Sequence, residues 1–218
     1  MRSLLALAAL WPAAALAQPC VPTSAIAADG RVLGHLPYGG VAPELLVEAP
    51  EGFALRAGCR MRAEVAADLA RLLAAAASDP TTGGELRGAS CHRSLTWQAS
   101  VFCAESHRDP ALRAISVAPP GHSEHATGFA VDFAIRPSPN CPDVAGCMAA
   151  LPPYRWLVRN AARFGFEQSF PAGNKQGVKW EPWHWRWVGA TAAAPGAARA
   201  RFLFAKARKL YPAGPTVP

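Results

Sequence analysis

Two short stretches of the chain place metal-binding side chains close together. In the first, His125 is followed seven residues later by Asp132, which interrupts the otherwise apolar run 129–135. A carboxylate is rarely placed in the core of a strand unless it is paired or bound to a metal. In the second stretch, Glu181 precedes His184 by three residues. These side chains are therefore the first candidates for a functional site.

Two histidines and one carboxylate, with a fourth position left to water, form the usual ligand set of a catalytic zinc site. We predict that His125, Asp132 and His184 bind Zn2+ in this way. Zinc lowers the pKa of water towards neutrality, and a nearby carboxylate can accept a proton from that water as it attacks a carbonyl carbon. Glu181 is the predicted general base, and Arg93 is the candidate that stabilises the oxyanion.

Each of these residues also has a purely structural interpretation. His125 could be an ordinary turn histidine, and Asp132 could be a buried ion-pair partner. Glu181 could serve as a cap or pair with Lys179 or Arg186. Arg93 could lie on the surface or in an ion pair. The occurrence of both stretches in one chain favours the metal site over these alternatives.

Three tryptophans, Trp183, Trp185 and Trp187, occupy every second position of the second stretch. Alternate residues of a strand share one face, so these indoles are expected on the same side of a sheet. Core packing is their structural interpretation, and a wall of a substrate cleft is the functional one. We assign Trp183, which lies within the second stretch, to substrate binding.

The spacing of apolar residues predicts the elements that must position these side chains. Met61, Val65, Leu69 and Leu72 recur at helical intervals between charged residues, which is typical of an amphipathic helix. Further elements are expected as strands at 85–90, 129–135 and 183–188 and as helices at 96–106, 154–164 and 199–210. Together they predict an α+β fold in which a small antiparallel sheet holds the zinc site and helices flank it.

The two ends of the chain differ in composition from its middle. Arg2 precedes an apolar run that closes in a small-x-small pattern, so residues 1–17 are predicted to be a secretory signal peptide. This run is shorter than the ~20 apolar residues that a membrane span needs, so no membrane span is expected. We expect a loop-rich segment at 18–60, a zinc-binding domain at 61–190, and an Ala/Pro linker with a basic tail at 191–218.

All six cysteines lie beyond the predicted cleavage point. An even number of cysteines in an exported chain predicts disulfides, which suit the periplasm or the extracellular space. A cysteine zinc site is disfavoured because the sequence has no C-x-x-C pair. Loop lengths lead us to expect Cys141 with Cys147 and Cys91 with Cys103, which leaves Cys20 with Cys59.

The sequence is basic, with 22 Lys and Arg against 15 Asp and Glu. Such an excess suits an anionic polymer such as a cell wall, although it could also serve solubility alone. No aromatic-basic nucleic-acid motif accompanies the charge, so we expect no nucleic-acid partner.

The two stretches resemble the motifs of VanY-like D-alanyl-D-alanine carboxypeptidases, which share a zinc fold with lysostaphin-type peptidases and the Hedgehog signalling domain. The family's S-x-H-x-x-G-x-A-x-D motif is matched by Ser123, His125, Gly128, Ala130 and Asp132. Its E-x-W-H motif is matched by Glu181, Trp183 and His184, and its Arg-Ser segment at the substrate is matched by Arg93, Ser94 and Gln98. The similarity covers roughly residues 61–189, and the joint occurrence of these motifs is highly specific.

The resemblance implies a role for each matched residue. The three predicted ligands would bind zinc, Glu181 would act as the base, and Arg93 would steady the substrate carbonyl or carboxylate. Ser123 and Gln98 would help to place the peptide. One departure is that Cys91 and His92 stand where many relatives have Gly-Tyr before the arginine, which affects the local pocket.

We therefore expect a zinc-dependent D-alanyl-D-alanine carboxypeptidase that acts on peptidoglycan stem peptides as a periplasmic or secreted monomer. An endopeptidase of the same fold, which cuts inside the stem peptide or the cross-bridge, is the nearest alternative, and the motifs do not separate the two. A non-catalytic wall-binding module is disfavoured because Glu181 and the three predicted ligands are all present.

Overall fold

The computed structural model describes residue 20 and residues 26–104, 107 and 109–218. The predicted signal peptide at 1–17 lies outside these residues. Within the described part of the chain, no helix is both long and apolar enough to cross a bilayer.

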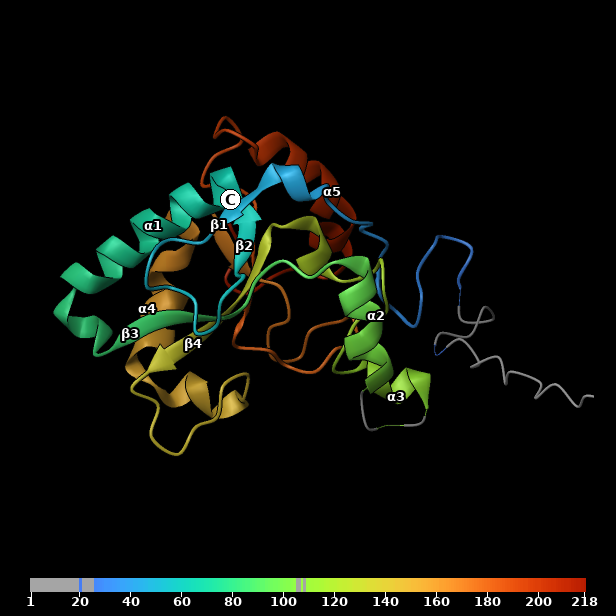
Figure 1. Cartoon of the computed structure of the whole chain (residues 1–218), viewed down its shortest axis with the longest axis horizontal. Coiled ribbons are helices and arrows are strands. Elements are labelled where there is room, and N and C mark those ends of the chain that lie inside the picture. The colour runs from blue at the N-terminus through green and yellow to red at the C-terminus, as the bar shows by residue number, and fades with distance from the viewer. Residues whose placement is uncertain (1–19, 21–25, 105–106, 108) are drawn as a thin grey trace, which may run out of the picture.

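A four-stranded antiparallel sheet lies at the centre of the fold (Figure 1). Its strands are β3 (Glu85–Ser90), β4 (Ala130–Arg136), β6 (His184–Trp187) and β5 (Phe166–Gln168), in that spatial order. Each neighbouring pair is antiparallel. The small antiparallel sheet of the predicted α+β fold is therefore confirmed, and the expected strand at 85–90 has the bounds of β3.

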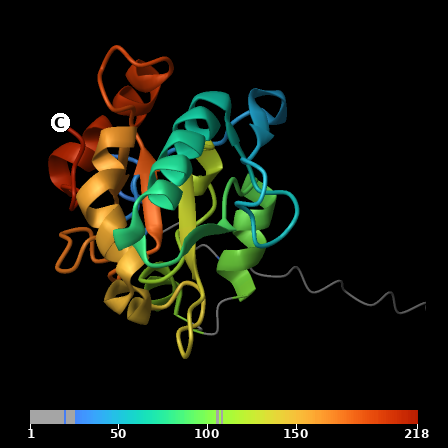
Figure 2. The same ribbon diagram turned by 90° about the vertical axis from the view of Figure 1, so that its left-hand side faces the viewer.

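Two helices cover one face of this sheet. These are α1 (Ala63–Ser78) and α4 (Pro152–Asn160), which continues into the 3-10 turn η6 (Ala161–Phe164). Figure 2 shows both helices in front of the strands. Apolar residues recur on one side of α1 at helical spacing, and this side is buried. The core beneath the helices contains Leu69, Leu72, Phe133, Trp156, Leu157, Phe166, Trp185 and Trp187.

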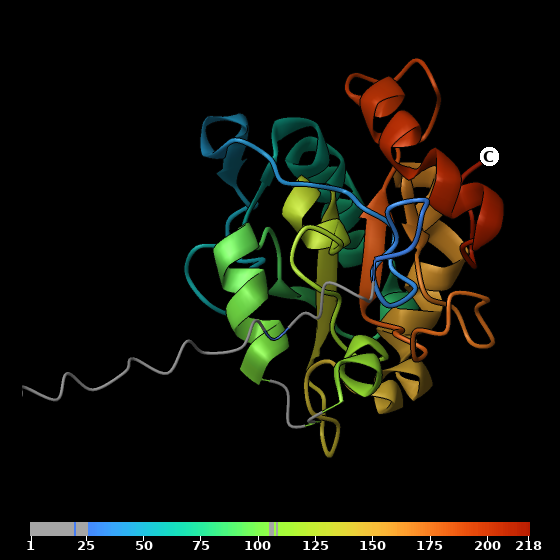
Figure 3. The ribbon, with the colours of Figure 1, turned by 90° about the vertical axis from the view of Figure 1, so that its right-hand side faces the viewer.

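The opposite side of the sheet is covered by shorter elements and loops. The helices α2 (Leu95–Ala104) and α3 (Pro110–Ala114) follow β3 in the chain. Segment 26–40 crosses in front of the sheet between α2 and α5 (Figure 3). It is held there by the backbone amides of Tyr38 and Gly39, which both donate to the carbonyl of Gly121. The loop-rich N-terminal segment therefore packs against the central sheet.

The expected loop-rich segment at 18–60 also contains a strand that sequence patterns did not indicate. The strand β1 (Leu46–Glu48), preceded by the 3-10 turn η2 (Pro43–Leu45), pairs with β2 (Arg60–Arg62) just before α1. The remaining short elements are the 3-10 turns η3 (Pro80–Thr82), η4 (Glu124–Thr127) and η5 (Gly146–Ala150).

The basic C-terminal stretch forms α5 (Ala197–Leu210), close to the helix expected at 199–210. Its apolar side is buried in the core through Ala197, Ala200, Phe204 and Ala207. The ring of Phe204 meets Phe129 edge to face at 6.3 Å between centroids. The basic residues of this stretch therefore lie on a helix that packs against the rest of the protein.

Three disulfides join the cysteines, and only Cys141–Cys147 is paired as expected. The expected Cys91–Cys103 and Cys20–Cys59 pairs are wrong, because the structure joins Cys20 to Cys103 and Cys59 to Cys91. Cys91 and Cys103 do not pair because α2, which contains Cys103, leads the chain away from Cys91 with a rise of about 1.5 Å per residue. Cys59 is close instead, since His92 donates a backbone hydrogen bond to Arg60.

Candidate metal centre and active site

Two strand neighbours and one turn bring the predicted ligands together. Asp132 of β4 lies directly opposite His184 of β6, so both side chains point to the same face of the sheet. His125 lies in η4, just before β4. Between them Gly128 adopts φ +74°, and a Cβ there would lie 2.7 Å from a methyl of Leu46. Glycine is therefore required at this turn for both its conformation and its size.

The ligand atoms of His125, Asp132 and His184 all lie within 4.8 Å of one another, and all three residues are buried. His125 Nε2 is 3.2 Å from one carboxylate oxygen of Asp132, and His184 Nδ1 is 3.0 Å from the other. The structure thus brings together the three residues that the sequence singled out as ligands.

Each histidine is oriented by a partner on its far side. His125 Nδ1 lies 2.7 Å from the carbonyl oxygen of Cys91. Because a carbonyl only accepts hydrogen bonds, this nitrogen carries the proton and Nε2 is left free. His184 Nε2 lies 3.0 Å from Glu124 Oε2, which leaves Nδ1 to face Asp132. Such outer partners commonly fix the ring orientation of metal-ligating histidines.

This arrangement fits a zinc ion in three respects. Two imidazoles and one carboxylate match the donor set of catalytic zinc sites. His125 Nε2 and His184 Nδ1 both face the carboxylate of Asp132. In addition, His125 Nε2 is buried without a hydrogen-bond partner in the described part of the chain, which is costly unless another group binds it.

The carboxylate of Glu124 is the centre of a buried polar network beside the metal ligands. Its Oε2 accepts from Ser169 Oγ at 2.5 Å as well as from His184. Its Oε1 accepts from Arg186 Nη1 at 2.9 Å and from the hydroxyl of Tyr38 at 3.4 Å. Although burial favours the neutral acid, Arg186 and His184 lower the pKa of Glu124 to about 2, so the group remains a carboxylate.

The network continues from Arg186 to the C-terminal end of the chain. Arg186 Nε donates to Glu167 Oε1 at 2.8 Å, and Arg208 of α5 lies 3.2 Å from the same oxygen. The second oxygen of Glu167 accepts from the backbone amide of Val217 at 3.1 Å. A buried chain of alternating charges therefore runs from His184 to the segment that follows α5.

The two histidines have opposite protonation tendencies when no metal is bound. Burial and the neighbouring Arg93 lower the pKa of His125 to about 4. Burial also disfavours charge on His184, but Asp132 and Glu124 outweigh it and raise its pKa to about 10. A metal at Nδ1 of His184 would therefore have to displace a proton.

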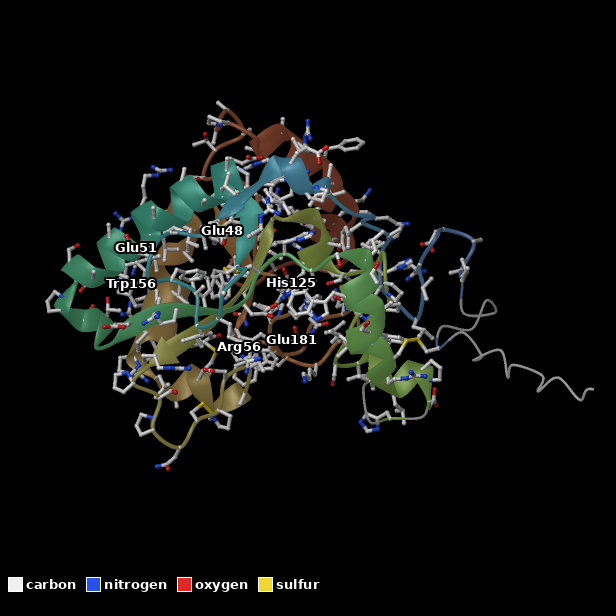
Figure 4. The ribbon with its side chains drawn as sticks, in the orientation of Figure 1. Glu48, Glu51, Arg56, His125, Trp156 and Glu181 are labelled. Atoms are coloured by element: carbon white, nitrogen blue, oxygen red, sulfur yellow. A yellow bond between two sulfur atoms is a disulfide. The ribbon has the colours of Figure 1, made fainter. Side chains whose placement is uncertain are left out.

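Glu181 lies in the loop before β6, with its side chain buried at the ligand cluster. Its backbone amide donates to the carbonyl of Phe170 at 3.0 Å. Figure 4 shows the labelled Glu181 close to His125 in that view. Burial raises the pKa of the Glu181 carboxyl to about 7, with His184 acting in the opposite direction. A carboxyl group with a pKa near neutrality can both accept and return a proton.

Arg93 is partly buried beside these carboxyl groups. Burial lowers its pKa, while Asp132 and Glu181 act to raise it. Its Nε has no hydrogen-bond partner among the described residues. The guanidinium is therefore held at the site with a donor available to a ligand.

A small cavity of about 40 Å3 borders the ligand cluster. Arg93, Ser123, His125, Glu181 and His184 all line it. Its remaining walls come from segment 26–40, the loop before η4 and the segment after β5, and they include His35, Tyr38, Val117, Phe170, Gln176 and Val178. His35 is held in place by the carbonyl oxygen of Ala114, 2.7 Å from its Nε2.

Two other predicted site residues, Gln98 and Trp183, do not line this cavity. Gln98 is fully buried and donates from Nε2 to the carbonyl of Ala118 at 2.6 Å, so it supports the loop that forms one wall. Trp183 is buried in the core cluster and is not among the lining residues of the cavity. The ring of Trp183 instead lies 5.4 Å from the ammonium of Lys179.

The sequence analysis missed Glu124 and Tyr38, and it considered Arg186 only as a partner of Glu181, whereas Arg186 pairs with Glu124 and Glu167. Glu124 occupies a variable position (x) of the first motif, so the motif assigned it no role. A signal was nevertheless present at Arg186, because a charged residue between two tryptophans of a strand requires a buried partner. Nothing in the sequence connected Tyr38 with the site.

Comparison with known families agrees with this geometry. The family model described as VanY, D-alanyl-D-alanine carboxypeptidase, matches residues 58–190. The chain is 42% identical over 79 residues to a D-alanyl-D-alanine carboxypeptidase of Enterococcus faecalis (strain ATCC 700802 / V583), covering 35% of this chain and 26% of that protein. It is 35% identical over 115 residues to the putative carboxypeptidase YodJ of Bacillus subtilis (strain 168), covering 51% of this chain and 41% of that protein. The chain thus spans well under half the length of these curated relatives.

Solved structures of similar fold cover more of the chain. The LdcB LD-carboxypeptidase superposes with a TM-score of 0.62 at 29% identity, covering 79% of this chain and 82% of that one. The vancomycin-resistance D,D-pentapeptidase VanY in complex with Zn(II) gives a TM-score of 0.53 at 28% identity, covering 75% of this chain and 88% of that one. VanYB in complex with D-alanine-D-alanine gives a TM-score of 0.51 at 28% identity, covering 71% of this chain and 82% of that one. With its family match, its fold and its ligand geometry in agreement, this chain belongs to the VanY family of D-alanyl-D-alanine carboxypeptidases.

Proposed function

We propose that this protein is a zinc-dependent D-alanyl-D-alanine carboxypeptidase that acts on peptidoglycan stem peptides. The observation that carries the proposal is the convergence of His125, Asp132 and His184, with Glu181 and Arg93 lining the same cavity. The family match and the relatives solved with Zn(II) and with D-alanine-D-alanine support it.

The bound Zn2+ would supply a Lewis acid that polarises the scissile carbonyl and lowers the pKa of water. Glu181 takes a proton from the attacking water as the oxygen bonds to the carbonyl carbon, and returns it to the amine as the C–N bond breaks. Arg93 donates to the substrate carbonyl or to the carboxylate of the terminal residue. The products are a shortened peptide and free D-alanine.

The small cavity favours removal of a terminal residue over cutting within a chain. Its volume of about 40 Å3 suits a small side chain, and His35 and Tyr38 stand among its walls. An endopeptidase needs room for chain on both sides of the scissile bond. We therefore assign the cavity to the terminal D-alanine, with Ser123 at its wall as a contact for the peptide.

An LD-carboxypeptidase is the second candidate, because the superposition with LdcB has a TM-score of 0.62. Such an enzyme would remove the terminal D-alanine from a tetrapeptide in which an L-configured centre precedes the scissile bond. The same residues could carry out either reaction, so the substrate decides between them.

The discriminating experiment offers zinc-loaded protein equal concentrations of a pentapeptide ending in D-Ala-D-Ala and of the matching tetrapeptide. Preferential release of D-alanine from the pentapeptide supports the first proposal, and preferential release from the tetrapeptide supports the second. New muropeptides from purified wall without free D-alanine would identify an endopeptidase instead.

We also propose that the protein acts outside the cytoplasm. The three disulfides of the structure suit an oxidising compartment, in agreement with the predicted signal peptide. A periplasmic or secreted monomer remains the proposal, and fractionation of cells together with sizing of the purified protein tests it.

A further inference from the structure

A second, larger hollow borders the metal-ligand cluster. It has a volume of about 550 Å3 and is bordered by Arg93 and Asp132. Arg93 also lines the small cavity, so the two hollows meet at this guanidinium. The larger hollow therefore adjoins the small cavity at Arg93 and reaches the metal ligand Asp132.

A third hollow of about 170 Å3 extends this path along the edge of the sheet. It shares Arg56, Ala89 and Ser90 with the larger hollow and ends at Trp97. Strand β3 is an edge strand of the four-stranded sheet, and Ala89 and Ser90 are its last two residues. We call this path from Asp132 to Trp97 the β3 groove.

Arg56 lines both of these hollows. Arg56 is exposed, and none of the hydrogen bonds or ion pairs found among the described residues involves it. Arg136, on the same groove, is instead held by two hydrogen bonds to Asp143. Figure 4 shows the labelled Arg56 close to Glu181 in that view. Arg56, whose charge also acts on the nearby Asp143, is thus an exposed cation of the groove that can pair with an anionic ligand.

The far end of the groove presents an aromatic surface. Trp97 is 55% exposed, although tryptophan is usually well buried. Its backbone amide donates to Ser94 Oγ in the first turn of α2, which fixes its position on the rim. An exposed indole lining a hollow offers a flat apolar face on which a ring can stack.

We propose that the β3 groove binds the part of the wall strand upstream of the scissile bond, with Arg56 pairing a stem-peptide carboxylate and Trp97 stacking on the attached saccharide. This inference rests on the proposed function. The small cavity has room for little more than the terminal residue, so the remainder of the substrate must leave the site by another route. Outside the small cavity, the β3 groove borders both the metal ligand Asp132 and Arg93.

Binding is measured first with the zinc-loaded Glu181→Gln protein, which retains substrate without turnover. The ligands are a stem peptide with free side-chain carboxylates, the same peptide with these groups amidated, and the free-acid peptide carrying its disaccharide. Arg56→Ala should weaken binding of the free-acid peptide about tenfold and that of the amidated peptide less than twofold. Trp97→Ala should weaken binding of the disaccharide-bearing ligand about fivefold and leave the bare peptide unchanged.

The matched controls are Arg159→Ala on α4 and Phe202→Ala on α5, both exposed and outside the groove. They should change none of the three affinities. Equal losses on free-acid and amidated peptides, or equal losses with and without the disaccharide, would overturn the assignment of the groove.

Kinetics on the active protein separate this inference from the proposed function. Arg56→Ala should raise KM for the free-acid peptide about tenfold while kcat stays within twofold. A kcat loss with unchanged KM would contradict a binding role. Failure of the unaltered protein to release D-alanine from any peptide would refute the proposed function itself. If the groove is correctly assigned, Arg56→Ala would in that case still weaken binding of the free-acid peptide more than that of the amidated peptide.

Discussion

The two faces of the central sheet are built from alternate residues of the same strands, yet they carry opposite chemistry. One face holds Asp132, His184, Arg186 and Glu167, which the register places side by side. The other holds Val131, Phe133, Trp185, Trp187 and Phe166 under α1 and α4. Both faces are buried, so exposure does not distinguish them.

Neighbouring residues of one strand point to opposite faces, so one residue contributes to stability and the next to function. The apolar face removes large side chains from water and needs no specific partners, so it stabilises the fold. The polar face contains buried charges, which are tolerated only because each is paired and hydrogen-bonded. Substitutions on the polar face should therefore change chemistry or metal affinity, and those on the apolar face should change the free energy of unfolding.

The largest effect is expected for Glu181→Gln, beside the polar face. The amide has nearly the same size but cannot accept a proton, so turnover should fall about 10^3-fold. Zinc content, measured on the purified protein, should not change. Full activity of this variant would show that another group serves as the base.

A substitution on the apolar face gives the sharpest contrast. The ring of Phe133 meets those of Phe53, Phe166 and Trp185 within 6.4 Å, so Phe133→Ala should lower the free energy of unfolding by about 3–5 kcal/mol. Denaturant unfolding measures this change. The zinc dissociation constant of the remaining folded protein should stay within threefold, and a much larger change would mean that the two faces are not independent.

Glu124→Gln tests whether the outer network of the polar face supports the metal. The amide keeps the volume but loses the charge that faces His184 and Arg186, so zinc affinity should fall about 10–100-fold. Competition with a chelator gives the dissociation constant, and a cobalt-substituted sample should show an altered absorption spectrum. An unchanged affinity would reduce Glu124 to a structural ion-pair partner.

The smallest effect is expected at the distant end of this network. Arg208 is partly exposed and lies 3.2 Å from Glu167, so Arg208→Ala should cost about 1 kcal/mol of stability. The neighbouring exposed Lys209 provides the control, since Lys209→Ala should change the free energy of unfolding by less than about 0.5 kcal/mol. Thermal unfolding of the two variants side by side compares them, and equal values would place Arg208 outside the network.

The apolar face could be predicted from the sequence far better than the polar one. Helical spacing located α1 from Val65, Leu69 and Leu72, although Met61, which was expected in the helix, lies in β2 just before it. The alternation of tryptophans placed Trp185 and Trp187 on one face. These patterns are local, so a short window of sequence contains them. The ligands were also predictable, because a known pair of motifs contains all three of them.

The remaining parts depend on contacts between residues that are far apart in the chain. Glu124 and Arg186 are 62 positions apart, and no local pattern joins them. The pairing of Cys20 with Cys103 depends on where α2 ends in space, and that of Cys59 with Cys91 depends on the contact between Arg60 and His92. The wall that His35 and Tyr38 contribute to the cavity likewise depends on how segment 26–40 folds back onto the sheet.

The central claim is that the ligand face of the sheet performs zinc-dependent release of a terminal D-alanine. Free D-alanine released from a pentapeptide ending in D-Ala-D-Ala is measured before chelation, after chelation and after zinc is restored. The account predicts release, loss of release and recovery in that order. No release from a folded, zinc-loaded sample, or release that persists after the metal has been removed, would contradict it.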